Sequence, residues 1–251
     1  MTVLTLAAAQ SVSIAGDLPA NLARHQHLMG LAAQQGVQLL VFPELSLTGY
    51  EPQLVAELAL PPDSPRLQPL RNLARELKLT TVVGMPIRLS VDGPVLIGAL
   101  VLGADGSLAV YSKQHLHPGE ERVFVPGSGG APLQLGNEVL ALAVCADFCH
   151  ASHVQAAVDA GAGIYAAGVL ISEGGYAVDS ALLQGYARDH GILMLMANHG
   201  GPSGGWSCAG RSAIWGAQGQ LLGAVEGVGE ALLIAQRHGG QWRVEVRAVA
   251  G

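Results

Sequence analysis

Strand-like and helix-like segments alternate along nearly the whole chain, and this alternation restricts the possible folds more than any other feature. Residues 37–42 form a continuous apolar run, which is typical of a strand buried on both faces. Residues 18–35 and 65–79 carry apolar side chains at helical spacing. By the same patterns we expect strands at 3–9, 80–85, 95–102, 108–111, 140–144, 164–167, 193–197, 213–215, 221–225, 231–235 and 242–246, and helices at 151–160 and 178–190.

This order of elements predicts an α/β fold in which a mixed sheet is covered by helices on the outside. The pair Asp105-Gly106 lies between two apolar segments and indicates a hairpin there. No internal repeat, low-complexity tract or linker divides the chain. We therefore expect one domain over residues 1–251.

The composition indicates a large core and a small charged surface. Half of the 251 residues are hydrophobic and 13% are charged, compared with about 25% in an average domain. Such a chain suits a subunit that buries part of its surface in a homodimer or a higher homo-oligomer. The net charge is −6, so the sequence lacks the basic footprint of a protein that binds nucleic acid.

The sequence also lacks the features of a membrane or secreted protein. Its longest uncharged apolar stretch, residues 160–172, is shorter than the about 20 residues that span a bilayer. The first five residues lack the positive charge of a signal peptide. Three cysteines in a chain of this length argue against a disulfide framework. We therefore expect a cytoplasmic protein with reduced thiols and no membrane partner.

Three chemically active side chains follow expected strands. Glu44 comes after residues 37–42, Lys113 after 108–111, and Cys145 after 140–144. In an α/β protein, ligand sites collect outside the carboxyl ends of the strands. The segment after Cys145 can turn helical, and a helix N-terminus favours the reactive thiolate. A carboxylate, an ammonium group and a thiol in such positions are the parts of a nucleophilic hydrolase.

These residue types suit acyl transfer from an amide. The thiolate of Cys145 would attack the carbonyl carbon and form a thioester, while Glu44 takes the thiol proton and passes it to the leaving nitrogen. Lys113 and the backbone N–H of Ala146 would donate to the developing oxyanion. This chemistry requires no cofactor.

The longer motifs around these residues occur in a fixed order, Val41–Tyr50, Tyr111–Glu121 and Val144–Asp147, and further motifs lie at residues 124–127, 197–198 and 210–212. Together they resemble the nitrilase, or carbon–nitrogen hydrolase, superfamily over essentially the whole chain. The resemblance implies a four-layer α-β-β-α sandwich that commonly pairs into dimers. It also implies that Glu44 is the general base, Lys113 the oxyanion-stabilising lysine and Cys145 the nucleophile, with no metal.

The resemblance implies a second glutamate near the lysine. In the pattern Lys-x-x-Leu-x-Pro-x-x-Glu, which begins at Lys113, the match is Glu121 rather than Glu120. We expect Glu121 to orient Lys113 or to help position the substrate. The residues that we expect to contact the substrate are Tyr50, Ala146 and Val169.

The chain departs from the family pattern beside the nucleophile. Ala146 stands where relatives often have Tyr, Trp or Glu, and the usual aromatic-Pro-Glu a few residues later is absent. Cys-Ala-Asp is closer to the Cys-Tyr-Asp of many amidases than to the Cys-Trp-Glu of many nitrilases. We therefore expect hydrolysis of a small aliphatic amide or carbamoyl compound with release of ammonia. The alternative within the family is a nitrilase that acts on a small nitrile.

A protein of a different class stays open as well, namely a non-catalytic or zinc-binding protein on the same fold. Cys145, Cys149, His150 and His153 have the short spacing at which thiolates and imidazoles bind zinc. The expected strand end at Cys145 and the helix around His153 hinder their convergence. The intact Glu–Lys–Cys set favours the hydrolase. Whether Cys149, His150 or Trp206 contributes to the site is left open by the sequence.

Overall fold

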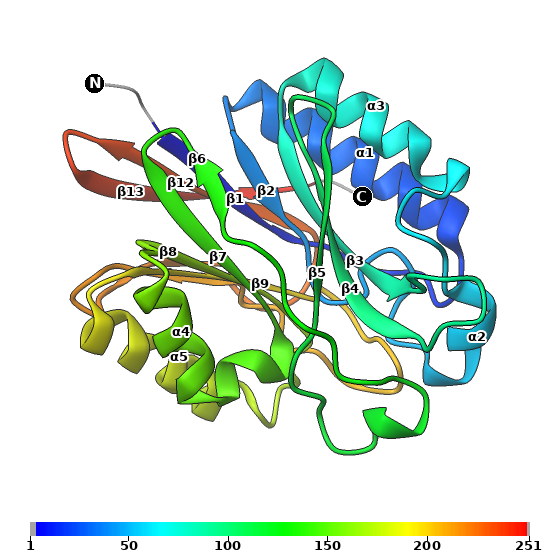
Figure 1. Cartoon of the computed structure of the whole chain (residues 1–251). Coiled ribbons are helices and arrows are strands. Elements are labelled where there is room, and N and C mark those ends of the chain that lie inside the picture. The colour runs from blue at the N-terminus through cyan, green and yellow to red at the C-terminus, as the bar shows by residue number, and fades with distance from the viewer. Residues whose placement is uncertain (1–3, 250–251) are drawn as a thin grey trace.

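Two β-sheets pack face to face, and helices cover their outer faces (Figure 1). The structure is a computed structural model that describes residues 4–249. The four-layer α-β-β-α sandwich implied by the family resemblance is therefore confirmed. The strand pattern alone predicted a mixed sheet, and it did not show that the strands divide into two sheets.

The first sheet has seven strands in the order β13-β12-β1-β2-β3-β4-β5. Neighbours β1, β2 and β3 are parallel, whereas β4 and β5 each pair antiparallel with the preceding strand. Because β4 is antiparallel to β3 and β5 is antiparallel to β4, β5 runs in the same direction as β3. The carboxyl ends of β2 and β5 therefore lie at the same edge of the sheet. The bounds are β1 Leu4–Gln10, β2 Leu39–Val41, β3 Thr80–Ile87, β4 Leu96–Leu102, β5 Leu108–Ser112, β12 Ala231–His238 and β13 Gln241–Ala248.

The second sheet has six strands in the order β11-β10-β9-β8-β7-β6. Its central strands β7, β8 and β9 are parallel, so their carboxyl ends also share one edge. The bounds are β6 Leu133–Leu135, β7 Glu138–Val144, β8 Ile164–Val169, β9 Leu193–Asn198, β10 Ala213–Trp215 and β11 Leu221–Ala224.

Helices α1 (Leu18–Gln34) and α3 (Gln68–Leu77) pack on the first sheet, and α4 (Ala151–Asp159) and α5 (Tyr176–His190) pack on the second (Figure 1). The Asp17 carboxylate caps α1 by accepting a hydrogen bond from the N–H of Ala20 at 3.0 Å. Helix α5 ends at Gly191, whose φ of 66° suits the left-handed cap. Short helical segments lie at α2 Val55–Leu58, Pro52–Leu54, Pro65–Leu67, Glu120–Arg122 and Cys145–Cys149.

The central strands are buried on both faces. Leu6 and Val41 of the first sheet belong to the core between the sheets, together with Leu142 and Leu195 of the second. Alternate residues such as Leu40 face the helices instead. Burial on both sides explains why these strands read as continuous apolar runs rather than alternating ones.

The expected helices and strands are all present with boundaries that differ by a few residues. Two short elements, β6 and α2, were not expected, because each has too few residues to show a period. Val3, the first residue of the first expected strand, lies outside the described residues. No helix within residues 4–249 is long and apolar enough to cross a membrane. That residues 1–251 form a single domain stays a prediction.

Candidate active site

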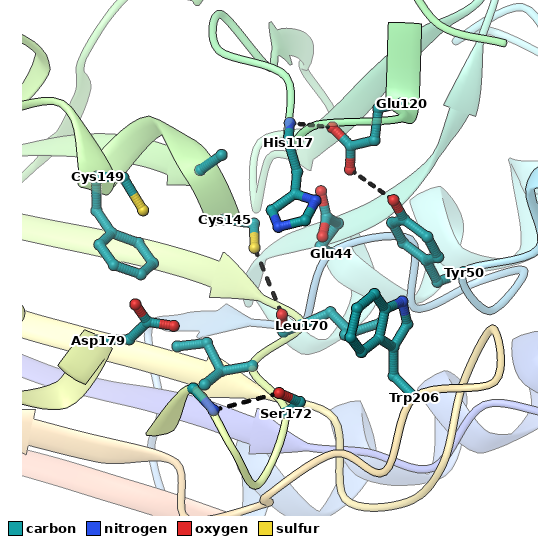
Figure 2. A pocket seen from close by; sticks show the side chains of 14 residues that line it. Glu44, Tyr50, His117, Glu120, Cys145, Cys149, Leu170, Ser172, Asp179 and Trp206 are labelled. Atoms are coloured by element: carbon teal, nitrogen blue, oxygen red, sulfur yellow. Dashed lines mark hydrogen bonds between the residues drawn. The ribbon is translucent and has the colours of Figure 1, made fainter. Parts of the chain in front are cut away.

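A cavity of about 250 Å³ opens where the strand ends of the two sheets meet (Figure 2). It brings together Glu44 from the segment after β2 and Cys145 from the segment after β7, which are far apart in the sequence. Residues from the loops after β5, β8 and β9 and from α5 complete its wall. The lining residues are Glu44, Tyr50, His117, Glu120, Cys145, Ala146, Phe148, Cys149, Leu170, Ile171, Ser172, Gly175, Asp179 and Trp206.

The backbone around Glu44 is held tightly between the sheets. A Cβ atom at Gly84 would lie 2.4 Å from the nitrogen of Leu45, and one at Gly168 would lie 2.6 Å from the carbonyl oxygen of Phe42. Only glycine allows both strands to approach this closely. The buried His199 donates from Nε2 to the carbonyl oxygen of Glu44 at 2.7 Å. These contacts fix the main chain from which the Glu44 carboxylate extends.

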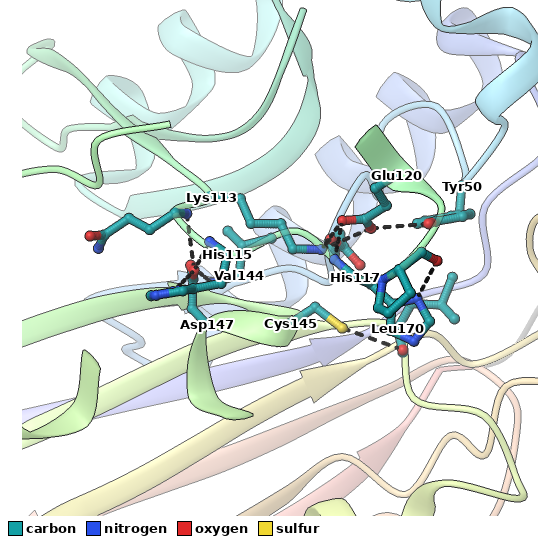
Figure 3. Close-up of polar contacts among 12 residues, drawn as sticks. Tyr50, Lys113, His115, His117, Glu120, Val144, Cys145, Asp147 and Leu170 are labelled. Atoms are coloured by element: carbon teal, nitrogen blue, oxygen red, sulfur yellow. Dashed lines mark hydrogen bonds and ion pairs between the residues drawn. The ribbon is translucent and has the colours of Figure 1, made fainter. Parts of the chain in front are cut away.

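Lys113 lies beneath the cavity and is 1% exposed. Its Nζ donates to Glu44 Oε1 at 2.6 Å and to both carboxylate oxygens of Glu120 at 2.8 Å (Figure 3). Burial by itself would lower the pKa of Lys113, but the neighbouring charges of Glu44, Cys145 and Glu120 raise it above its ordinary value. Lys113 is therefore a permanent buried cation between two carboxyl groups.

The expectation that Glu121 assists Lys113 is wrong, and the residue in that place is Glu120. Glu120 is 3% exposed and also accepts hydrogen bonds from Tyr50 Oη at 3.0 Å and from the N–H of His117 at 2.8 Å. Glu121 is exposed, and its carboxylate accepts a hydrogen bond from the N–H of Gly119. A short helical turn begins at Glu120 and directs this first side chain inward. Counting positions from the lysine did not reveal that turn.

We expect Glu120→Gln to lower kcat about 10–100-fold, because it removes the negative charge that holds Lys113 in place. A hydrogen bond to a charged group contributes roughly 1.5–3 kcal/mol, and about 1.4 kcal/mol corresponds to a tenfold change in rate. The matched variant Glu121→Gln changes an exposed neighbour and should retain kcat. Ammonia release measured for both variants tests the assignment. Equal losses in the two variants would contradict it.

Cys145 starts the helical turn that follows β7 and has a φ of 43°. A left-handed conformation is uncommon for a residue with a side chain and costs about 1–3 kcal/mol, so it is retained where the surrounding structure imposes it. The Sγ atom is directed toward the carbonyl oxygen of Leu170 at 3.5 Å (Figure 2). The thiol is half-buried and lines the cavity, so a small molecule can reach it.

The electrostatics of Cys145 differ from the sequence-based expectation of a stabilised thiolate. Burial, followed by the negative charge of Glu44, raises the pKa of Cys145 well above its ordinary value, although Lys113 acts in the opposite direction. A raised pKa favours the protonated thiol, so a base must remove that proton before or during attack.

Glu44 has the electrostatic character of such a base. Burial raises its pKa to about 7, even though the positive charge of Lys113 opposes the shift. A carboxylate with a pKa near neutral pH holds and releases a proton with little cost in either direction. Glu44 and Cys145 lie close enough to shift each other's pKa. The pair can therefore exchange a proton.

Asp147 connects the segments that carry Lys113 and Cys145, and sequence reasoning missed this role. Its Oδ1 accepts hydrogen bonds from the N–H groups of Gln114 at 3.0 Å and His115 at 2.8 Å, while its Oδ2 accepts one from the N–H of Val144 at 3.0 Å (Figure 3). The side chain is fully buried. It therefore fixes the lysine loop against the cysteine turn. The only signal in the sequence was a carboxylate two residues after the cysteine.

Two of the three residues that we expected to contact the substrate line the cavity. Tyr50 and Ala146 line it, whereas Val169 does not and packs in the core between the second sheet and its helices. Val169 is the last residue of β8, and successive strand residues face opposite sides. Leu170, one residue later, lines the cavity instead. Trp206 and Cys149, which the sequence left open, also lie in the wall.

The four residues of the zinc alternative do not gather around one point. The His150 ring stacks on His115 with ring centres 3.8 Å apart, and His153 is bonded between Tyr111 and Tyr165. Within residues 4–249, no group of three or more histidine, cysteine, aspartate or glutamate side chains is arranged to hold a metal ion. The geometry gives this alternative no support.

Sequence comparison matches residues 5–243 to the family described as carbon-nitrogen hydrolase. Curated proteins also match, and two of them do so over part of their length. The glutamine-dependent NAD(+) synthetase of Thermotoga maritima is 29% identical over 156 residues, which cover 60% of this chain and 27% of that protein. The nitrilase of Pyrococcus abyssi is 33% identical over 134 residues, which cover 51% of this chain and 50% of that protein. The matches thus span half or less of these curated relatives.

Solved structures match over almost the whole chain. An amidase variant from Nesterenkonia sp. AN1, showing Michael addition of acrylamide at its active-site cysteine, is 32% identical with a TM-score of 0.82, and the match covers 92% of both chains. Another variant of that amidase, in complex with butyramide, is 30% identical with a TM-score of 0.84 and covers 94% of this chain and 92% of that one.

Proposed function

Because the chain belongs to the carbon–nitrogen hydrolase family, we propose that it is an amidase that hydrolyses a small aliphatic amide or carbamoyl compound and releases ammonia. The observation that carries the proposal is the buried contact of Lys113 with Glu44 and Glu120 beneath the same cavity that exposes the Cys145 thiol. It provides a base, a cation and a nucleophile at one place. The similarity to an amidase structure that binds butyramide supports the choice of substrate class.

The first half of the proposed reaction forms a thioester. Glu44 takes the proton of Cys145, and the sulfur forms a bond to the carbonyl carbon of the amide. The positive charge of Lys113 and the N–H of Ala146 stabilise the negative oxygen of the tetrahedral intermediate. Glu44 then gives its proton to the nitrogen, the carbon–nitrogen bond breaks, and ammonia leaves.

The second half regenerates the enzyme. A water molecule gives a proton to Glu44 as its oxygen attacks the thioester carbon, and Lys113 again faces the developing charge. The carbon–sulfur bond breaks, the sulfur receives the proton back from Glu44, and the carboxylic acid leaves. Glu120 touches no reacting atom in this scheme. It positions Lys113, to which both of its carboxylate oxygens are bonded.

A small nitrile is the second candidate substrate, because the Pyrococcus abyssi relative that is 33% identical is a nitrilase. The same thiol would attack the nitrile carbon. The experiment that separates the candidates measures ammonia release by the purified protein from butyramide, a carbamoyl compound and butyronitrile under identical conditions. We expect turnover of the amide or carbamoyl compound. Turnover of the nitrile alone would replace the amidase by a nitrilase, and no release from any of them would contradict the proposal.

The rate should depend on pH through Glu44. The reaction needs its ionised form, and burial raises its pKa to about 7. We therefore expect kcat/KM to rise about tenfold per pH unit on the acidic side and to level off above about pH 7. Initial rates between pH 5 and pH 9 in buffers of constant ionic strength check this. A flat profile across pH 5 to 7 would remove Glu44 as the base.

We also propose that the protein is cytoplasmic and forms a homo-oligomer. Its three cysteines are all unpaired, as suits a reducing compartment. Sedimentation of the purified protein measures the assembly.

A further inference from the structure

The cavity contains a carboxylate that the proposed reaction does not use. Asp179 lies in the first turn of α5, lines the cavity and is half-buried. Within the part of the chain that the structure describes, its carboxylate has no hydrogen-bond or ion-pair partner. Figure 2 shows it on the Cys149 side of Cys145, with Glu44 and Tyr50 on the other side. Asp179 therefore lies on the opposite side of Cys145 from Glu44 (Figure 2).

A carboxylate in the first turn of a helix interacts favourably with the helix dipole, but only weakly. Helix α5 is capped at Gly175 without any side-chain hydrogen bond, so Asp179 does not serve as its cap. By comparison, Asp189 at the other end of α5 is paired with Arg188 at 2.8 Å and is 58% exposed. Burial raises the pKa of Asp179, while His117 acts in the opposite direction. The carboxylate has therefore lost part of its hydration, and no neighbouring side chain among the described residues donates a hydrogen bond to it.

The cavity as a whole disfavours a negative substrate. Among its lining residues there is no lysine or arginine, while three of them carry carboxyl groups: Glu44, Glu120 and Asp179. Lys113, the buried cation beneath the cavity, is already bonded to the first two. A ligand with a second carboxylate would meet uncompensated negative charge, whereas a ligand with an amino group would supply the missing partner.

Part of the cavity wall is apolar. Phe148, Leu170 and Ile171 line the cavity along with Cys145 and Asp179. Such a wall suits a short methylene chain, because contact with it removes apolar surface from water. The cavity thus combines the Glu44 and Cys145 side chains, an apolar part of the wall and the carboxylate of Asp179.

We propose that Asp179 binds a positively charged amino group at the far end of the substrate, so that the preferred substrate is an aliphatic amide or carbamoyl compound that carries an amine. This inference rests on the proposed amidase function for the reacting end. The carboxylate of Asp179 accepts a charge-assisted hydrogen bond from the ammonium group. Asp179 is a specificity-determining residue and takes no part in bond breaking.

The test compares ligands of equal length in the Cys145→Ala protein, which should bind them without turnover. Isothermal titration calorimetry gives dissociation constants for γ-aminobutyramide, for valeramide, in which a methyl group replaces the ammonium, and for succinamate, which carries a carboxylate. We expect the amino compound to bind about tenfold or more tightly than valeramide, and succinamate to bind most weakly. Equal constants for the first two would overturn the proposal.

Asp179→Asn in the same background should bring the ratio of the two constants close to one, whereas the matched variant Asp189→Asn on the same helix should retain it. A ratio that survives in Asp179→Asn would also overturn the proposal. If that variant does not fold, Asp179→Ser takes its place. A ratio near one in the Cys145→Ala protein, which retains Asp179, would overturn the proposal without any further variant.

Ammonia release by the wild-type protein separates this inference from the function on which it rests. Equal kcat/KM for γ-aminobutyramide and valeramide would support the amidase function and overturn the role of Asp179. If binding depends on Asp179 but no ammonia is released, the amidase function is overturned and the proposed amine site is supported.

Discussion

Replacing Cys145 with alanine is expected to reduce amide turnover by roughly 10⁶-fold, the order found when an enzyme loses its covalent nucleophile, and thus below detection. No other lining residue can replace it in the same position. Cys149 is exposed, and its side chain lies to one side of Cys145 in the cavity wall (Figure 2). The fold should persist, because alanine removes one partly exposed sulfur atom. Ammonia release and circular dichroism of the variant measure the two effects.

The control is Cys208→Ala, which removes a buried thiol outside the cavity lining and should retain most of the activity. Intact-protein mass spectrometry of the wild-type protein, quenched during turnover, should show an acyl adduct that the Cys145→Ala protein lacks. Residual turnover above about 1% of wild type in the Cys145→Ala protein would contradict the thioester mechanism.

Replacing Lys113 with alanine should damage both catalysis and stability. Loss of one oxyanion-stabilising group lowers kcat by about 10²–10³-fold. The variant also leaves Glu44 and Glu120, whose side chains are 1% exposed, as two facing buried carboxyl groups with no cation. Removing one partner of a buried ion pair costs roughly 3–5 kcal/mol of unfolding free energy. Steady-state kinetics and urea unfolding measure the two losses.

Lys113→Arg should rescue activity poorly, because the planar guanidinium group differs in size and reach from an ammonium group held at 2.6 Å and 2.8 Å. The chain's other lysine supplies the control. Lys78 is exposed at a left-handed position that ends α3, and asparagine tolerates that conformation. Lys78→Asn should therefore leave kcat unchanged. Near-normal kcat in Lys113→Ala would remove Lys113 from the mechanism.

The local parts of the site were accessible from the sequence because each depends on a short stretch of chain. A continuous apolar run predicted β2, and the residue type after it singled out Glu44; the same reasoning singled out Lys113 and Cys145. We expected them to lie close together from the family resemblance and from the rule that ligands bind at strand ends. Their catalytic roles stay proposals that the variants above test.

The errors occurred where side-chain direction depends on backbone geometry that a pattern does not encode. Glu120 and Glu121 are adjacent in sequence, and only the turn that begins at Glu120 decides which of them reaches Lys113. Val169 was expected to contact the substrate, but Leu170 lines the cavity instead. Strand β8 ends at Val169, and the alternation of its side chains decides which residue faces the cavity.

By itself, the sequence determined the order of helices and strands, the chemical identity of the three groups at the strand ends, and the membership of a family, because these depend on residue type and local spacing. Tertiary structure decided the division into two sheets, the choice of Glu120, and the position of Asp179 in the cavity wall. It also decided that burial raises the pKa of both Glu44 and Cys145. Burial and charge proximity arise only when distant segments pack together, so no local pattern of residues contains them.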